Sequence, residues 1–126
     1  MPAVLKIDPQ RRIVSSTFHG QVTSDEIVLH QRTITADAHF QPDFADVVDL
    51  SAVSIVAVND SVLGTLAAGP SVFNDGVPHV IIAPLDLPHE LALRYRDLAQ
   101  KTRSNLHVVR TLAEAQDLLE HLGYQL

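Results

Sequence analysis

The side chains best suited to chemistry in this chain stand where its expected strands end. They are carboxylates, hydroxyls and one imidazole, namely Asp49, Ser51, Asp60, Ser61, Asp86 and His89. In an open parallel sheet, ligands bind beyond the carboxyl ends of the strands, so these residues would form one rim of helix starts. Ser61, His89 and Asp86 include the residue types of a hydrolytic triad. Because no Gly-x-Ser-x-Gly turn exposes the serine, a hydrolase is the weakest of the functions that we consider.

The residues around Ser61 also have a structural use. Asn59 or Asp60 can cap a helix over residues 60–68, and Asp86 can cap the helix that follows it. A phosphate on Ser61 would gain about 1 kcal/mol from the free N–H groups and the dipole of the helix start. The neighbouring Asp60 would oppose it by charge repulsion. We therefore expect no catalytic residue and treat Ser61 as a candidate site of regulatory phosphorylation.

The histidines do not follow a metal-binding pattern. They are His19, His30, His39, His79, His89, His107 and His121. None has a second histidine beside it or four residues away, so we interpret them as scattered surface or edge residues. A glycine-rich phosphate loop is also absent, since Gly64 stands alone. The sequence predicts neither a metal nor a cofactor.

Composition limits the function classes. The 126 residues suit one domain, 46% of them are hydrophobic, and the net charge is −6. A nucleic-acid-binding protein would need clustered Lys and Arg, so we expect no nucleic-acid partner. The absence of cysteine excludes a disulfide scaffold. We find no signal peptide and no apolar run near the ~18 residues of a membrane span, and expect a cytoplasmic protein.

Strand and helix signals alternate along the chain. A hairpin turns at Asp8-Pro9, Gly20 ends its second strand, and Thr23 with Glu26 forms a capping box that opens a helix to about Ala38. Further strands are expected over 45–50, 79–83 and 106–110, and further helices over 60–68, 88–101 and 112–122. The order β-β-α-β-α-β-α-β-α predicts an α/β fold. Its five-stranded sheet would be mostly parallel, with an antiparallel N-terminal edge strand and packed helices.

The connection Ala52–Val58 is unusually apolar for a loop. It is either an extension of the preceding strand or a flap over the core, or else a hydrophobic surface for a partner or a second copy of the chain. Such a contact surface would consist of Val53, Ile55, Val56 and Val58.

Two segments carry a resemblance to a known family. Asp49-Leu50-Ser51, followed by Asp60-Ser61-Val62-Leu63-Gly64, resembles the STAS domains of bacterial anti-sigma-factor antagonists. In those domains a strand ending in Asp-Leu-Ser leads to a helix beginning Asp-Ser-Ser-Gly, and the second serine is phosphorylated. Val62 stands at that position here. The resemblance implies a single STAS-like domain, a (βα) superhelix, over residues 1–126, and a helix start that regulates and docks partners.

A second run is similar to a family of small uncharacterised bacterial proteins. Val80-Ile81-Ile82-Ala83-Pro84-Leu85-Asp86-Leu87, followed by Ala92-Leu93-Arg94-Tyr95, matches their pattern. By fold this family is grouped with STAS domains and with the lipid-binding CRAL–TRIO domains. It has no established common activity.

These features support two leading functions. The first is a non-catalytic STAS-like domain that docks to an unknown protein partner as a homodimer, through the Val53–Val58 segment and the Ser61 helix start. The alternative is a small apolar-ligand or lipid-binding protein. Its pocket would be lined by aromatic residues, namely Phe40, Phe44, Phe73 and Tyr95.

Overall fold

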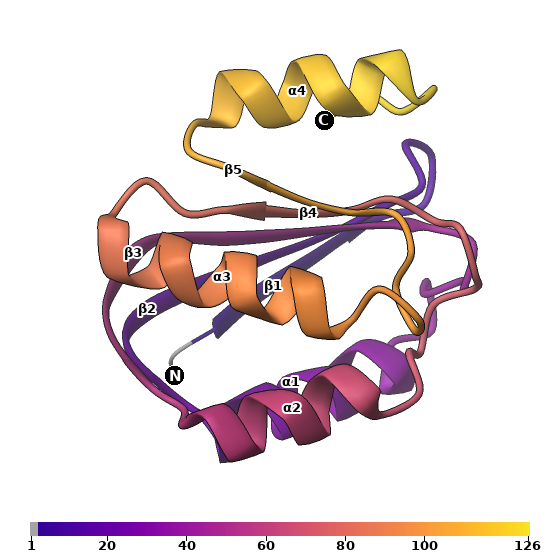
Figure 1. The fold of residues 1–126 in the computed structure, drawn as a ribbon. Coiled ribbons are helices and arrows are strands. Elements are labelled where there is room, and N and C mark those ends of the chain that lie inside the picture. Colours follow the sequence, from indigo (N-terminus) through magenta and orange to yellow (C-terminus); the bar gives the residue numbers. More distant parts are fainter. Residues whose placement is uncertain (1–2) are drawn as a thin grey trace.

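A computed structural model describes residues 3–126 as an α/β fold (Figure 1). The strands are β1 (Ala3–Asp8), β2 (Ile13–Thr23), β3 (Ala45–Ala57), β4 (His79–Ile82) and β5 (Leu106–Val109). The helices are α1 (Ser24–Ala36), α2 (Asp60–Ala68), α3 (Asp86–Leu98) and α4 (Leu112–His121). The element order is therefore the predicted one.

The strands form one sheet in the order β1-β2-β3-β4-β5. β1 is antiparallel to β2 at one edge and the other neighbours are parallel, which confirms the predicted sheet. Because the parallel strands follow one another across the sheet, right-handed crossovers place α1, α2 and α3 on the same face. α4 follows the last strand and covers the opposite face (Figure 1).

Local side-chain signals set several element ends. The predicted capping box is present, since Thr23 Oγ1 accepts from the Glu26 N–H at 3.3 Å and Glu26 Oε2 accepts from the Thr23 N–H at 3.4 Å. α1 ends at Ala36 rather than Ala38. We expected Asp86 to cap α3, and this is wrong. The N-cap position falls on Leu85, which makes no side-chain hydrogen bond there.

β2 and β3 are longer than the sequence predicts. We expected Gly20 to end β2, and for Ala52–Val58 we considered a strand extension, a flap or a partner surface. In the structure β2 runs to Thr23 and β3 to Ala57, and the two strands are paired with each other. Gly20 has φ +65°, a conformation that glycine adopts freely, and the register shifts on both sides of it. The apolar segment is therefore a strand extension.

This extension carries α1 and α2 away from the centre of the sheet. The last β3 residue paired with β4 is Asp49, so residues 50–57 continue beside β2 alone. At roughly 3.3 Å per residue they extend the strand by about 26 Å. α1 follows β2 directly and α2 starts two residues after β3, so both helices begin at the far end of this extension (Figure 1).

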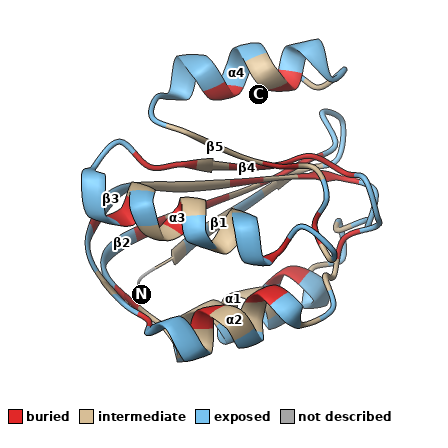
Figure 2. Ribbon diagram, in the orientation of Figure 1, coloured by how far each residue is buried: buried red, intermediate tan, exposed pale blue. Residues whose placement is uncertain are grey.

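Buried and partly buried residues follow one another along the central strands β3 and β4 (Figure 2). Val47 and Ile82 point toward α4 and are 3% exposed, and Leu119 of α4 is fully buried against them. Their chain neighbours Val48 and Ile81 point to the opposite face and are only partly buried. The centre of the sheet is therefore tightly packed under α4, whereas β3 and β4 are packed more loosely on the opposite face, where the tight clusters lie around β2 and α1.

Candidate functional site

A cavity of about 190 Å³ lies between the sheet and helices α1, α2 and α3. Most of its wall is apolar and includes Phe18, Val22, Leu50, Leu63 and Leu91. For comparison, an apolar cavity of about 150 Å³ is large enough to bind benzene. The cavity can therefore hold a small organic molecule.

The cavity results from the way the helices are placed. α2 packs mainly against α3 rather than against the sheet. Strands inside a parallel sheet are normally buried on both faces, yet Val48 and Ile81 keep accessible surface where they line the cavity. Side chains that lack close neighbours lose dispersion contacts, which a bound molecule would restore.

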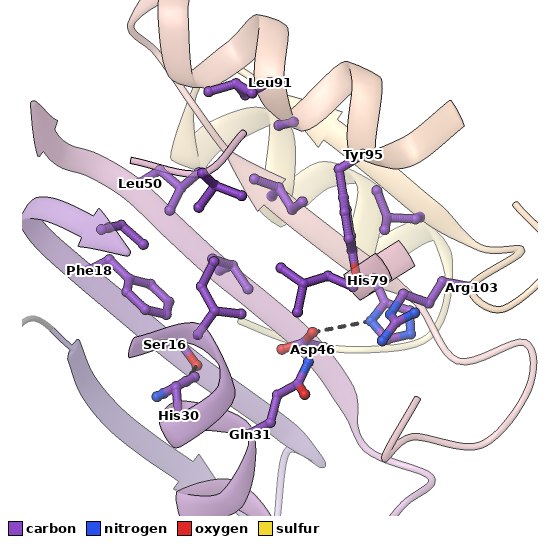
Figure 3. A pocket seen from close by; sticks show the side chains of 18 of the residues that line it. Ser16, Phe18, His30, Gln31, Asp46, Leu50, His79, Leu91, Tyr95 and Arg103 are labelled. Atoms are coloured by element: carbon purple, nitrogen blue, oxygen red, sulfur yellow. Dashed lines mark hydrogen bonds and ion pairs between the residues drawn. The ribbon is translucent and has the colours of Figure 1, made fainter. Parts of the chain in front are cut away.

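One end of the cavity carries a polar pair. Asp46 and His79 are directly opposite each other on β3 and β4. His79 Nδ1 lies 3.1 Å from Asp46 Oδ2, and because a carboxylate only accepts, the imidazole N–H donates (Figure 3). The His79 side chain is 6% exposed and that of Asp46 is 17% exposed. The edge of the Phe73 ring contacts the imidazole, with the centroids 5.2 Å apart.

A second polar pair lies on the cavity wall between β2 and α1. His30 Nε2 is 2.5 Å from the hydroxyl oxygen of the buried Ser16, and the His30 ring packs edge-on against Phe18. Burial lowers the pKa of His30, and the negative charge of Asp46 opposes this shift in part. The imidazole is therefore neutral at pH 7, with one ring nitrogen able to donate and the other able to accept.

Tyr95 and Arg103 complete the polar end of the cavity. Burial raises the pKa of Tyr95; the positive charge of Arg103 opposes this shift, and Asp46 adds to it. The Arg103 guanidinium is 5.7 Å from the Tyr95 ring centroid. Its Nη1 donates to the carbonyl oxygens of Ala67 and Gly69 at the end of α2, at 3.4 and 3.3 Å. Arg103 therefore holds a fixed positive charge beside Tyr95.

The predicted rim residues Asp49 and Ser51 lie in the middle of β3 rather than at the end of a strand, since β3 continues to Ala57. Asp49 Oδ1 accepts from both the backbone N–H and the hydroxyl of Ser51, at 2.8 and 2.6 Å. Neither residue lines the cavity.

The remaining rim residues each have separate partners. Asp60 forms an ion pair with Arg94 of α3, and Asp86 forms one with Arg110 at 3.1 Å. His89 Nδ1 donates to the carbonyl oxygen of Ala83 at 2.9 Å. Ser61 is exposed in the first turn of α2. Over residues 3–126 no hydrogen bond joins the side chains of Ser61, Asp86 and His89, so the structure does not bring these three together.

The predicted contact surface is mostly inside the molecule. Val53 is fully buried and Val58 is 8% exposed, while Val56 lines the cavity. Only Ile55, at 57% exposure, stands out to solvent. The expectation of an exposed four-residue surface is therefore wrong. A register shift between Val53 and Ile55 places these two residues in different environments, and Val58 is buried after the end of β3.

Two of the four aromatic residues predicted to line a pocket do line the cavity. Phe73 and Tyr95 line the cavity, whereas Phe44 is buried in a neighbouring core cluster that Phe40 packs against. Asp46 was not among the predicted site residues, and the buried His79 was expected at the surface or an edge. Both are polar residues at the beginnings of apolar strands, and this position is the sequence signal that could have identified them as site residues.

No group of three or more histidine, aspartate and glutamate side chains in the described part of the chain is arranged to hold a metal ion. None of the helices described here is long and apolar enough to cross a membrane.

Comparison with known proteins identifies the fold. No family model and no curated protein matches the chain. The structure is similar to that of an uncharacterised protein of the DUF3478 family, with a SpoIIAA-like fold, from Shewanella loihica PV-4. The identity is 14%, the match covers 93% of each chain, and the TM-score is 0.56. The protein therefore has a SpoIIAA-like, or STAS-like, α/β fold, as the sequence predicts.

Proposed function

We propose that this protein binds a small, mainly apolar molecule in the cavity between the sheet and α1–α3. The observation that carries this proposal is the partial exposure of Val48 and Ile81 inside a sheet whose opposite face is tightly packed. Binding pockets are typically concave and apolar with a few convergent polar groups, and this cavity has that composition. This supports the second of the two leading functions over the first.

Methyl NMR tests the proposal with 1-methyl-4-propylbenzene as the probe. Titration should shift the methyl signals of Val48, Leu50 and Ile81 in a saturable way. The methyl signals of Val47 and Ile82, which face α4, should stay in place. The neighbouring residues on each strand thus serve as internal controls.

A cavity-filling variant gives the matched mutational test. Val48→Phe should weaken probe binding at least tenfold, because the added ring occupies the cavity. Leu112→Phe adds the same ring on an exposed side chain of α4 and should leave binding unchanged. Far-UV circular dichroism checks that both variants fold, and Leu91→Phe offers a second blocking position. The absence of saturable shifts in the wild type would refute the function.

Protein docking under the control of Ser61 is the second candidate. Leu85 and Leu87, just before and within the first turn of α3, are 50% and 73% exposed. Ser61 is exposed near Arg94, which already binds the adjacent Asp60 and could also bind a phosphate.

Two experiments test these features. Light scattering with Leu87→Asp tests the homodimer, and intact-mass analysis of the wild type against Ser61→Ala tests phosphorylation. A strict monomer at high concentration argues against a homodimer, and an unmodified protein from the native host argues against phosphorylation.

A further inference from the structure

The polarity of the cavity changes from one end to the other (Figure 3). Gln31, Asp46, His79 and Arg103 gather at one end, and the Tyr95 side chain points its hydroxyl toward them. Leu50, four residues beyond Asp46 on β3, lies at the opposite end, roughly 13 Å along the strand. A molecule that fills the cavity therefore meets hydrocarbon at one end and hydrogen-bonding groups at the other.

Asp46 has unused acceptor capacity. Its side chain is mostly buried, and its one side-chain hydrogen bond among residues 3–126 comes from His79. An ionised carboxylate can accept about four hydrogen bonds, and a buried one is costly when they are missing. The carboxylate therefore favours a ligand that brings a donor.

Gln31 and Tyr95 supply the opposite chemistry. Both side chains line the cavity, and neither makes a hydrogen bond within the described residues. Every buried side-chain nitrogen or oxygen in this part of the protein has a hydrogen-bond partner. Because the Gln31 amide and the Tyr95 hydroxyl have none, these polar atoms lie at accessible surface. The Gln31 amide and the Tyr95 hydroxyl can both donate to an oxygen of a ligand.

The charges around this end disfavour an ionised ligand group. Asp46 repels a carboxylate and attracts an ammonium group, and the fixed guanidinium of Arg103 does the reverse, so for either ion the attraction of one charge is offset by the repulsion of the other. Either ion would also lose its water in a cavity that is mainly apolar. An uncharged hydroxyl avoids both costs, and it donates and accepts at once.

We propose that the ligand is amphipathic and carries an uncharged hydroxyl, as in a phenol or a medium-chain alcohol. This hydroxyl donates to Asp46 and accepts from Tyr95 or Gln31, while the hydrocarbon part lies against Leu50 and Leu91. The inference rests on the proposed function, because it assigns the head group of the molecule that the cavity takes.

Three probes of similar size test the head group. They share a propylbenzene body and differ at the para position: 4-propylphenol carries a hydroxyl, 1-methyl-4-propylbenzene a methyl group, and 4-propylbenzoate a carboxylate. The phenol should bind about tenfold or more tightly than the hydrocarbon, as expected for a hydrogen bond to a charged acceptor. The benzoate should bind most weakly. Dissociation constants come from the methyl NMR titration described above.

Variants then assign the preference to particular atoms. Asp46→Asn should reduce the preference for phenol over hydrocarbon and strengthen benzoate binding, because the repelling charge is gone. Tyr95→Phe removes only a hydroxyl and should weaken phenol binding severalfold without affecting the hydrocarbon. Asp97→Asn, on an exposed side chain, and Tyr124→Phe, whose hydroxyl bonds the Asp43 carbonyl oxygen outside the cavity, are the matched controls.

The outcomes separate the two proposals. Binding of all three probes with equal affinity would overturn the head-group inference and leave the apolar-binding function standing. Binding of none of them would overturn both. A phenol preference that survives Asp46→Asn and Tyr95→Phe unchanged would also overturn the inference, since other groups would then recognise the hydroxyl.

Discussion

The two faces of the sheet present contrasting solutions to packing in one small domain. Under α4, Val80 and Leu119 are fully buried, and the interior is a conventional apolar core. Under α1–α3, the same strands expose Val48 and Ile81 to a cavity and place Asp46 and His79 in it. Consecutive residues of one strand therefore belong to a closed core and to an open site.

The difference shows how this fold can separate stability from binding. α4 follows β5 after a short connection and lies directly on the sheet, so it can pack without constraint from the other helices. α1 and α2 both begin at the outer end of the long β2–β3 pair; α1 packs back on β2, whereas α2 contacts the sheet little. The core under α4 and the buried clusters around β2 supply stability, which allows looser packing over β3 and β4 on the cavity side.

The largest expected effect comes from truncating the same residue type on each face. Ile82→Ala should destabilise the protein by about 2–5 kcal/mol, because it opens a cavity in a closed core. Ile81→Ala should cost at least about 1 kcal/mol less, since its side chain already borders a cavity and has fewer contacts to lose. Urea unfolding followed by circular dichroism measures both. Equal losses would mean that the two faces are equally well packed.

A smaller effect is expected from adding one carbon on each face. Val47→Ile should destabilise by about 1–3 kcal/mol, because there is no room beside Val47 under α4. Val48→Ile should be neutral or stabilising, since the added methyl group enters the cavity. Urea unfolding of the pair gives the comparison, and a loss of stability in Val48→Ile would contradict the cavity.

Two partly buried histidines should make the stability of the protein depend on pH. Burial lowers the pKa of His30 in the cavity wall and of His107 on β5, and Arg96 adds to the shift at His107. Each imidazole takes up a proton near pH 6.5 when unfolded but only at lower pH when folded. The unfolded state then binds more protons, so stability is complete above pH 6.5 and falls as the pH drops toward the folded pKa.

His30→Gln and His107→Gln separate the two contributions. Each should flatten part of the decrease in unfolding free energy between pH 7 and 5, as measured by urea unfolding. A bound apolar probe should deepen the pH dependence of the wild type through His30, whose ring lines the cavity, and not through His107. A probe effect that persists unchanged in His30→Gln would contradict this assignment.

Local signals predicted the fold well because they depend on neighbours in sequence. The capping residue Thr23 set the start of α1, and the alternation of strands and helices predicted a mostly parallel sheet with an antiparallel edge strand. The extension of β3 was one of several alternatives for Ala52–Val58, because Ser51 and Ser54 interrupt the apolar run and suggest a loop. Pairing with β2, which continues past Gly20, keeps this segment extended.

The candidate site could not be predicted in the same way. Asp46 and His79 are far apart in the chain and meet only through the register of two parallel strands. The cavity itself depends on where α2 lies. The hydrophobic periodicity of α2 is the same whether the helix packs on α3 or on the sheet, so the sequence does not distinguish the two arrangements. Sequence reasoning found Tyr95 and Phe73 because large aromatic residues are few in this chain.

The smallest expected effect concerns the ends of helices on the two faces. Asn59 Oδ1 accepts from the Val62 N–H at 2.8 Å, so Asn59→Ala should cost α2 about 1 kcal/mol. Because α2 has little contact with the sheet, this loss should appear as local opening, with amide exchange in α2 about fivefold faster. Thr111→Ala removes the corresponding cap of α4, whose amides should stay protected by packing on the sheet. Ser61→Ala should leave both helices unchanged, and equal acceleration in α2 and α4 after loss of their caps would show that packing does not distinguish the two faces.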